Sequence, residues 1–245
     1  MIGWLRGEQQ APQIALGGRE VPLAIKRHPR ARRMTLRLAP GGEEVRVTLP
    51  RWGRTADALA FAESRRDWLE AQLAQQPAPN PPAPGGTLAY RGEQLHIAWD
   101  AALPRRPALG TGEIRLGGTE QSLARRLQRW LEGEALQLMG EDLACYCAAA
   151  GCAPPALRLS RARRRWGSCS GAKGSREQTI RANWRLVQAP DAVRRSVIAH
   201  EVAHLVHFDH SPAFHALLGE IYEGELAAAD RWLKQHGRSL FASFG

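Results

Sequence analysis

The feature that most restricts how this chain can fold is a proline-rich stretch at residues 77–86, which reads PAPNPPAPGG. Five prolines and two glycines in ten residues exclude a helix or a central strand, because proline fixes φ and has no backbone N–H. We therefore expect an exposed and extended connection here. Secondary structure must form separately on the two sides of it.

Short strands are predicted on both sides of this connection, where apolar and polar residues alternate. The candidates are residues 21–25, 34–38, 45–49, 88–90, 95–99, 113–116, 157–159 and 179–187. Pro40, Gly41 and Gly42, between the second and third candidates, are typical of a hairpin. Residues 1–19 give only weak signals and are expected to form a loose arm. The sequence shows no internal repeat.

Helical spacing of apolar residues appears in several longer segments. Residues 55–76 form the first, and residues 119–151 form a long amphipathic one. Pro190 is well placed for the first turn of another. Residues 212–236 predict a last helical stretch with a break near Gly224.

The composition is that of an ordinary globular protein, with 44% hydrophobic and 24% charged residues. No apolar run approaches the roughly 18 residues of a membrane span, and the first ten residues lack a signal-peptide core. The four cysteines show no C-x-x-C spacing, which favours reduced thiols in a cytoplasmic protein without membrane contact. We expect an α+β fold, with a strand-rich region at residues 20–117 and a second domain at residues 118–245.

The strongest functional signal is His200-Glu201-Val202-Ala203-His204. Two histidines four residues apart lie on one side of a helix, so both imidazoles can bind one ion. Glu201 lies about 100° further round the helix and can hold a water molecule, whose pKa a zinc ion lowers to about 7. Apolar neighbours such as Ile198 and Leu205 argue against a solvated helix. The motif predicts a catalytic zinc with Glu201 as general base.

A catalytic zinc has three protein ligands and an open position. His210 follows His204 by six residues, just before Ser211 and Pro212, where the helix is expected to end. The chain can turn there and bring His210 to the ion. Downstream carboxylates are the alternatives, replacing or supplementing His210, at Glu220, Glu223 and Glu225. His215 is expected near the site without binding the ion.

Positive charge is clustered in this chain, which has a formal net charge of +10. Residues 26–37 contain six Lys or Arg and no acid, and residues 155–185 contain nine against a single glutamate. Such patches attract nucleic acid, phosphates or acidic substrates. A run that directly precedes Trp166 is a candidate contact for nucleic acid or phosphate, and comprises Arg161, Arg163, Arg164 and Arg165.

Several motifs occur in a characteristic order. They are Arg165-Trp166-Gly167-Ser168-Cys169-Ser170, Ala182-Asn183-Trp184-Arg185-Leu186, Pro190, His200-Glu201-Val202-Ala203-His204-Leu205, and Asp209-His210-Ser211 with Phe214. In this order they resemble the YgjP-like metallopeptidases, a family related to the SprT-type and WLM zinc peptidases. The resemblance implies a zincin-like catalytic domain that binds zinc through His200, His204 and His210, with Glu201 as base.

These observations leave several functions open. The first is a zinc-dependent metallopeptidase of the pattern H-E-x-x-H-x5-H, which hydrolyses a peptide or protein substrate with zinc-activated water. The second is a nucleotide or phosphoester hydrolase that uses the same zinc with an arginine clamp. The third is nucleic-acid binding or a DNA-associated protease. Substrate contacts are expected from strands beside the cleft, through Arg165, Trp166 and Asn183.

Overall fold

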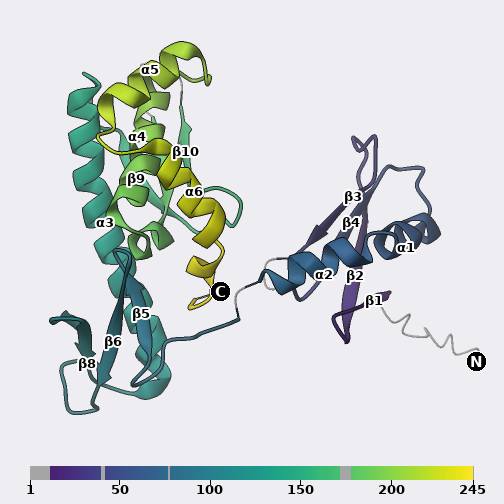
Figure 1. Cartoon of the computed structure of the whole chain (residues 1–245), viewed down its shortest axis with the longest axis horizontal. Helices are drawn as coiled ribbons and strands as arrows, with labels where there is room; N and C mark the ends of the chain where they lie inside the picture. The colour runs from purple at the N-terminus through teal and green to yellow at the C-terminus, as the bar shows by residue number, and fades with distance from the viewer. Residues whose placement is uncertain (1–11, 40–41, 77, 172–177, 245) are drawn as a thin grey trace, which may run out of the picture. The chain divides into compact units, whose positions relative to one another are not determined.

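The structure is a computed structural model that describes residues 12–39, 42–76, 78–171 and 178–244. The chain divides into two compact units, Met1–Gln76 and Pro77–Gly245 (Figure 1). The division falls at the first residue of the proline-rich stretch. Among the helices of the described residues, none is both long and apolar enough to cross a membrane.

The N-terminal unit is a four-stranded sheet with two short helices packed on it. Its elements are β1 (Gln13–Leu16), β2 (Arg19–Arg27), β3 (Thr35–Leu38), β4 (Val45–Leu49), α1 (Thr55–Glu63) and α2 (Arg66–Ala74). The strand order is β1-β2-β4-β3, with β2 and β4 parallel and the other neighbours antiparallel. Ala58, Ala62 and Leu69 of the helices share a core with the apolar face of the sheet.

Two sequence expectations change in this unit. Residues 13–16 are not a loose arm, because they pair with β2 across a turn at Gly17 and Gly18, and Leu16 is fully buried. Residues 1–11, Pro40 and Gly41 lie outside the described part of the chain. The helix predicted at residues 55–76 is divided in two, where the Ser64 hydroxyl donates to the backbone oxygen of Phe61 at 2.9 Å. Such a bond competes with regular helix pairing.

The second unit begins with a sheet of the same topology. Its strands are β5 (Thr87–Tyr90), β6 (Glu93–Trp99), β7 (Ala108–Leu109) and β8 (Glu113–Leu116). They lie in the order β5-β6-β8-β7, with β6 and β8 parallel and the other neighbours antiparallel. Leu88, Ile97 and Ile114 belong to the core of the second unit. The division therefore differs from the expected domain start at residue 118, because the apolar side chains of these strands pack with the helices that follow.

A long α-helix, a three-stranded sheet, three shorter α-helices and three short 3-10 helices (η) complete the unit. They are η1 (Glu120–Ser122), α3 (Leu123–Ala149), β9 (Ala156–Ser160), β10 (Gly167–Ser170), β11 (Thr179–Asn183), η2 (Trp184–Gln188), α4 (Asp191–Val206), α5 (Pro212–Ile221), α6 (Leu226–His236) and η3 (Ser239–Phe241). The sheet order is β10-β11-β9, so β10 is an edge strand. The break between α5 and α6 includes Gly224, as predicted. The α+β class is confirmed.

Helices α3 and α4 pack against each other in this unit (Figure 1). The apolar stripe of α3 includes Leu127, Leu131 and Met139, all fully buried. On α4, Ile198 and Val202 are fully buried in the same core. This packing leaves the opposite side of α4 for the histidines.

Candidate metal centre

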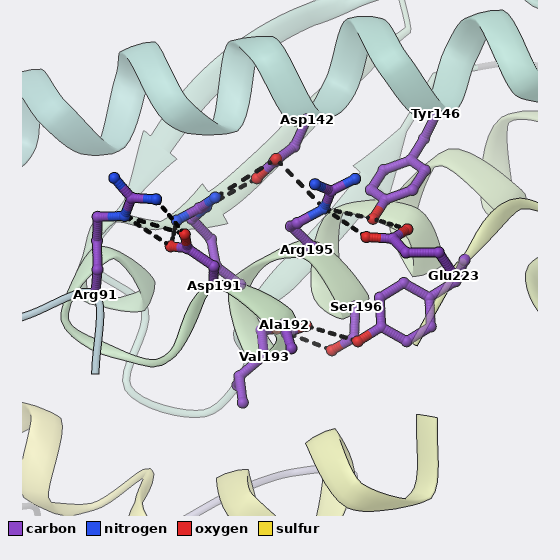
Figure 2. Close-up of polar contacts among 11 residues, drawn as sticks. Arg91, Asp142, Tyr146, Asp191, Ala192, Val193, Arg195, Ser196 and Glu223 are labelled. Atoms are coloured by element: carbon purple, nitrogen blue, oxygen red, sulfur yellow. Dashed lines mark hydrogen bonds and ion pairs between the residues drawn. The ribbon is translucent and has the colours of Figure 1, made fainter. Parts of the chain in front are cut away.

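Charged side chains fix the N-terminal half of α4 (Figure 2). The Arg194 side chain is only 4% exposed, and its Nε donates to Oδ2 of Asp142 on α3 at 2.8 Å. Arg194 also pairs with Asp191, the first residue of α4. Arg91, in the turn between β5 and β6, pairs with the same aspartate. The helix is thus connected to both α3 and the preceding sheet.

Arg195, the next residue of α4, takes part in a second set of polar contacts (Figure 2). The Nε of Arg195 donates to the Tyr146 hydroxyl at 2.9 Å and pairs with Oε1 of Glu223 at 2.8 Å. Tyr146 in turn donates to Oε2 of Glu223 at 2.8 Å. The hydroxyl of Tyr222 donates to the backbone oxygen of Ala192 at 2.8 Å. These bonds connect α4 to α3 and to the segment after α5.

Three imidazoles converge beyond this network. His200 and His204 lie one turn apart on α4, and His210 follows the end of the helix. The Nε2 atom of His200 is 3.2 Å from Nε2 of His204 and 3.3 Å from Nε2 of His210. Among the described residues, these three form the cluster that could hold a metal ion, with ligand atoms all within 4.8 Å of one another.

The nitrogen spacing fits a tetrahedral zinc site. Two nitrogens bound at about 2.0–2.1 Å to a tetrahedral ion lie about 3.3–3.4 Å apart. The two Nε2 separations measured from His200 are close to this range. Three imidazoles also leave one position of a tetrahedron open, as catalytic zinc requires.

The turn after α4 brings His210 back to the helix. His207 leaves the helix in an extended conformation, with φ −125° and ψ 109°. Its backbone oxygen is 3.1 Å from Nδ1 of His204, which holds that ring with Nε2 directed into the cluster. Ser211 then caps α5, with Pro212 in the first turn of the helix.

The Phe214 ring packs against all three imidazoles. Its ring centroid lies 5.0 Å from that of His200, 4.5 Å from that of His204 and 4.8 Å from that of His210. The side chain is fully buried. His215 is exposed, and its ring centroid lies 6.3 Å from that of His210, outside the cluster.

Burial keeps the first imidazole neutral. It lowers the pKa of His200 to about 4, with further lowering from His204 and His210. Burial also lowers the pKa of His204, although the bond to the His207 carbonyl opposes this. Neutral imidazole is the form that binds a metal.

Glu201 is buried beside the edge strand β10. Burial raises the pKa of its carboxyl to about 7, while a backbone bond from Cys169 and the charge of Arg165 lower it. Its Oε2 is buried and has no hydrogen-bond partner among the described residues. Gly167 lies directly against this carboxylate, since a Cβ atom there would be 2.3 Å from Oε1 of Glu201. An unsatisfied buried oxygen of this kind can accept a proton from a bound water.

The downstream carboxylates offered as alternative ligands lie outside the cluster. Glu223 is engaged by Tyr146 and Arg195. Glu225 pairs with Arg231 at 3.1 Å. Glu220 is exposed on α5.

The residues expected to contact substrate are positioned differently from one another. Asn183 is fully buried, its amide donates to the backbone oxygen of Ala162 at 2.7 Å, and its Oδ1 accepts from the Arg185 N–H at 3.1 Å. These bonds give Asn183 a structural role in place of the expected substrate contact. The Trp166 ring packs against Phe241 with centroids 5.7 Å apart. Of the three, only Arg165 is exposed, and its positive charge lowers the pKa of Glu201.

Two arginines of the run before Trp166 already have partners. Arg161 pairs with Glu132 at 2.8 Å. The guanidinium carbon of Arg163 lies 5.9 Å from the centroid of the Phe241 ring. Their charges, together with burial as the largest cause, lower the pKa of Arg185 to about 10.

Three parts of the site were not predicted from the sequence, namely Gly167, Phe214 and the His207 carbonyl. Gly167 and Phe214 stood within motifs that marked the family but carried no assigned role. The carbonyl of His207 has no side-chain signal, because any residue could supply it. Only the path of the chain after α4 reveals its contact with His204.

The sequence profile described as YgjP-like, metallopeptidase domain, matches residues 32–236. This match covers most of the chain, including parts of both compact units and all three histidines of the cluster. Neither the curated proteins nor the solved structures gave a significant match. The histidine cluster and the profile lead to the same assignment, and the chain belongs to the YgjP-like family of metallopeptidase domains.

Proposed function

We propose that this protein is a zinc-dependent peptidase, with Glu201 as general base and with His200, His204 and His210 as the zinc ligands. The observation that carries this proposal is the spacing of the three imidazole nitrogens beside a buried carboxylate. A bound zinc ion would polarise the substrate carbonyl and lower the pKa of water. The protein's own groups perform the proton transfers.

Glu201 is the group that moves the proton. Its carboxylate takes a proton from the attacking water and returns it to the nitrogen of the departing amine. The backbone N–H of Cys169 holds one side of the carboxylate. The free Oε2 is the atom that we assign to the water.

The edge of β10 supplies a surface for an extended substrate. The Asn183 N–H donates to the Trp166 carbonyl at 2.7 Å, and bonded and non-bonded pairs alternate along an antiparallel ladder. The backbone groups of Gly167 and Cys169 therefore face away from β11. The bond from Cys169 to Glu201 supports placing this edge beside the catalytic carboxylate. We infer that a peptide strand pairs with β10.

The decisive experiment compares metal content and turnover in matched variants. We expect Glu201→Gln to retain zinc and to lose roughly 10²- to 10⁴-fold in hydrolysis of an unfolded protein substrate, because the amide cannot accept a proton. His210→Ala should lose zinc. Glu220→Gln, which removes an exposed carboxylate outside the cluster, is the control and should change neither property.

Two results would contradict this proposal. Near-normal turnover in zinc-loaded Glu201→Gln would exclude the assigned base. Rapid hydrolysis of nucleoside triphosphates with no cleavage of unfolded protein would favour a phosphoester hydrolase.

A further inference from the structure

Two loops of the N-terminal unit leave its sheet at the same end. β2 ends at Arg27, which is paired with Leu49 at the end of β4, and β3 begins at Thr35, which is paired with Thr48. Residues 28–34 and 50–54 therefore emerge together, at the end of the sheet next to α1 (Figure 1). The Arg27 guanidinium joins the two loops, because its Nε donates to the backbone oxygen of Gly53 at 3.2 Å.

This end of the sheet carries charge of one sign. We call it the basic end, and define it by the exposed residues Lys26, Arg27, Arg30, Arg32, Arg33, Arg51, Trp52 and Arg54. No Asp or Glu occurs within residues 26–38 or 49–56. Asp57, just beyond, accepts a bond from the backbone N–H of Arg54 at the start of α1. Among the described residues, none of these seven cations forms an ion pair.

Trp52 is the exposed aromatic residue of the basic end. Its side chain is 79% exposed, whereas tryptophan is highly buried on average. It lies in a tight turn in which the Gly53 N–H donates to the Pro50 carbonyl at 3.1 Å. Arg51 and Arg54 flank it in the sequence. The turn thus exposes an aromatic ring in a segment whose charged residues are all arginines.

We propose that the basic end binds single-stranded nucleic acid. Unpaired guanidinium groups suit backbone phosphates, and an exposed indole suits the face of an unpaired base. Bases inside a duplex are stacked on one another and offer no free face to Trp52. A single exposed ring also provides little apolar surface for entering a membrane. The proposal concerns a surface in the N-terminal unit and does not depend on the metal centre.

The basic end differs from the other arginine-rich segment of the chain. Arg161 pairs with Glu132, and Arg163 lies over Phe241. In the basic end, the contacts of Arg27 with Gly53 and Thr55 are to neutral groups. Its positive charge is therefore not neutralised by the protein.

The test is fluorescence anisotropy with full-length protein, a labelled 20-nucleotide oligothymidine and a duplex of equal length, over a salt series. Trp52→Ala should weaken oligothymidine binding by about 5- to 150-fold, the range of one lost base stack. Trp52→Phe should restore most of the affinity. The triple variant Arg30→Ala/Arg32→Ala/Arg33→Ala should weaken binding and reduce the salt slope by up to about two.

Matched controls remove the same groups elsewhere. Trp68→Ala removes another exposed tryptophan of the same unit, and Arg105→Ala/Arg106→Ala/Arg129→Ala removes three exposed arginines of the second unit. Both should bind like the wild type, and all variants should keep wild-type circular dichroism and proteolysis of unfolded protein. Tighter binding to the duplex, or wild-type affinity in both Trp52→Ala and the Arg30 triple variant, would overturn the proposal.

Discussion

The two four-stranded sheets have the same strand order and directions but different partners. In the N-terminal sheet, Leu23 and Val47 share a core with the short helices α1 and α2. In the second sheet, Ile97 and Ile114 belong to the core that includes α3 and α4. One arrangement of strands thus serves once within a separate unit and once as part of the metallopeptidase core. The helices that follow each sheet, rather than its topology, determine this difference.

The first turn of the second sheet connects this sheet to helix α4, which carries His200 and His204. The first turn of the N-terminal sheet provides the comparison. Gly17 has φ +56° in the N-terminal sheet, and Arg91 has φ +51° at the corresponding place. Positive φ costs a non-glycine residue roughly 1–2 kcal/mol. Two contacts offset this conformational cost at Arg91. Its N–H donates to the backbone oxygen of Val187 at 2.8 Å, and its guanidinium pairs with Asp191 of α4. The second turn therefore acts as a contact with the histidine-bearing helix.

The largest expected effect concerns the buried ion pair of the second unit. Asp142→Ala leaves the Arg194 guanidinium buried without its main partner and should destabilise α3 and α4 by about 3–5 kcal/mol. In the N-terminal unit, Glu63→Ala breaks only an exposed pair with Arg66 and should cost less than about 1 kcal/mol. Hydrogen exchange of the amides in each unit measures both changes. Similar small effects in the two variants would remove this difference between the units.

The next largest effect is expected from core substitutions, which test whether the two sheets unfold in different cooperative units. Leu23 and Ile97 are buried at corresponding places in β2 and β6, and replacing either with Ala should cost about 2–5 kcal/mol. Ile97→Ala should lower the protection of α3 and the retention of zinc. Leu23→Ala should lower the protection of α1 and α2 alone. Equal loss of zinc in both variants would show that the units unfold together.

The smallest effect comes from exchanging the turn residues. Arg91→Gly relieves the positive φ but removes the ion pair with Asp191, so the net change at pH 7 should be within about 1 kcal/mol. The Gly17 N–H donates to Oε1 of Glu70 at 3.2 Å, so an arginine at this position could form only an exposed pair worth less than about 1 kcal/mol. Gly17→Arg should therefore destabilise the N-terminal unit by up to about 2 kcal/mol, because it places a non-glycine residue at positive φ. Urea denaturation of the two variants compares them directly. Stabilisation by Gly17→Arg would contradict the role assigned to the turn.

The pH dependence of Arg91→Gly provides a further check on the same contact. Burial raises the pKa of Asp191, but bonds from Arg91 and Arg194 outweigh it and lower the pKa below its usual value. A lowered pKa contributes stability above the unfolded value, near 3.9, which is lost as the pH falls through the folded value. The wild type should therefore lose more stability than Arg91→Gly between pH 7 and pH 3. Denaturation at the two pH values measures this difference.

Much of the secondary structure could be predicted because it depends on local patterns. Helix α4 followed from the spacing of His200 and His204, and α3 followed from its apolar stripe. The turn that returns His210 was expected from Ser211 and Pro212. The repeated sheet was missed, because strand order depends on pairing between distant segments that alternation alone does not specify.

Other parts of the site depend on contacts that sequence spacing cannot reveal. Asp142 and Arg194 are 52 residues apart, and neither lies in a distinctive pattern. Asn183 was expected beside the substrate because it lies in a family motif, yet its amide is used within the fold. β1 was missed because the four residues before Gly17 give too short a signal. Each error concerns a partner supplied by another element.

The contact between Gly167 and Glu201 limits which residues can replace this glycine. Within most strands, exchanging glycine for a larger residue improves strand propensity. At position 167 even the single methyl group of alanine would enter the space of the Glu201 carboxylate, 2.3 Å from Oε1. A saturation library selected for folding could accept substitutions here if Glu201 moved aside, whereas one selected for hydrolysis would retain glycine. The two selections would diverge at this strand position, where the loss of activity would come from a displaced Glu201 carboxylate rather than from an unfolded chain.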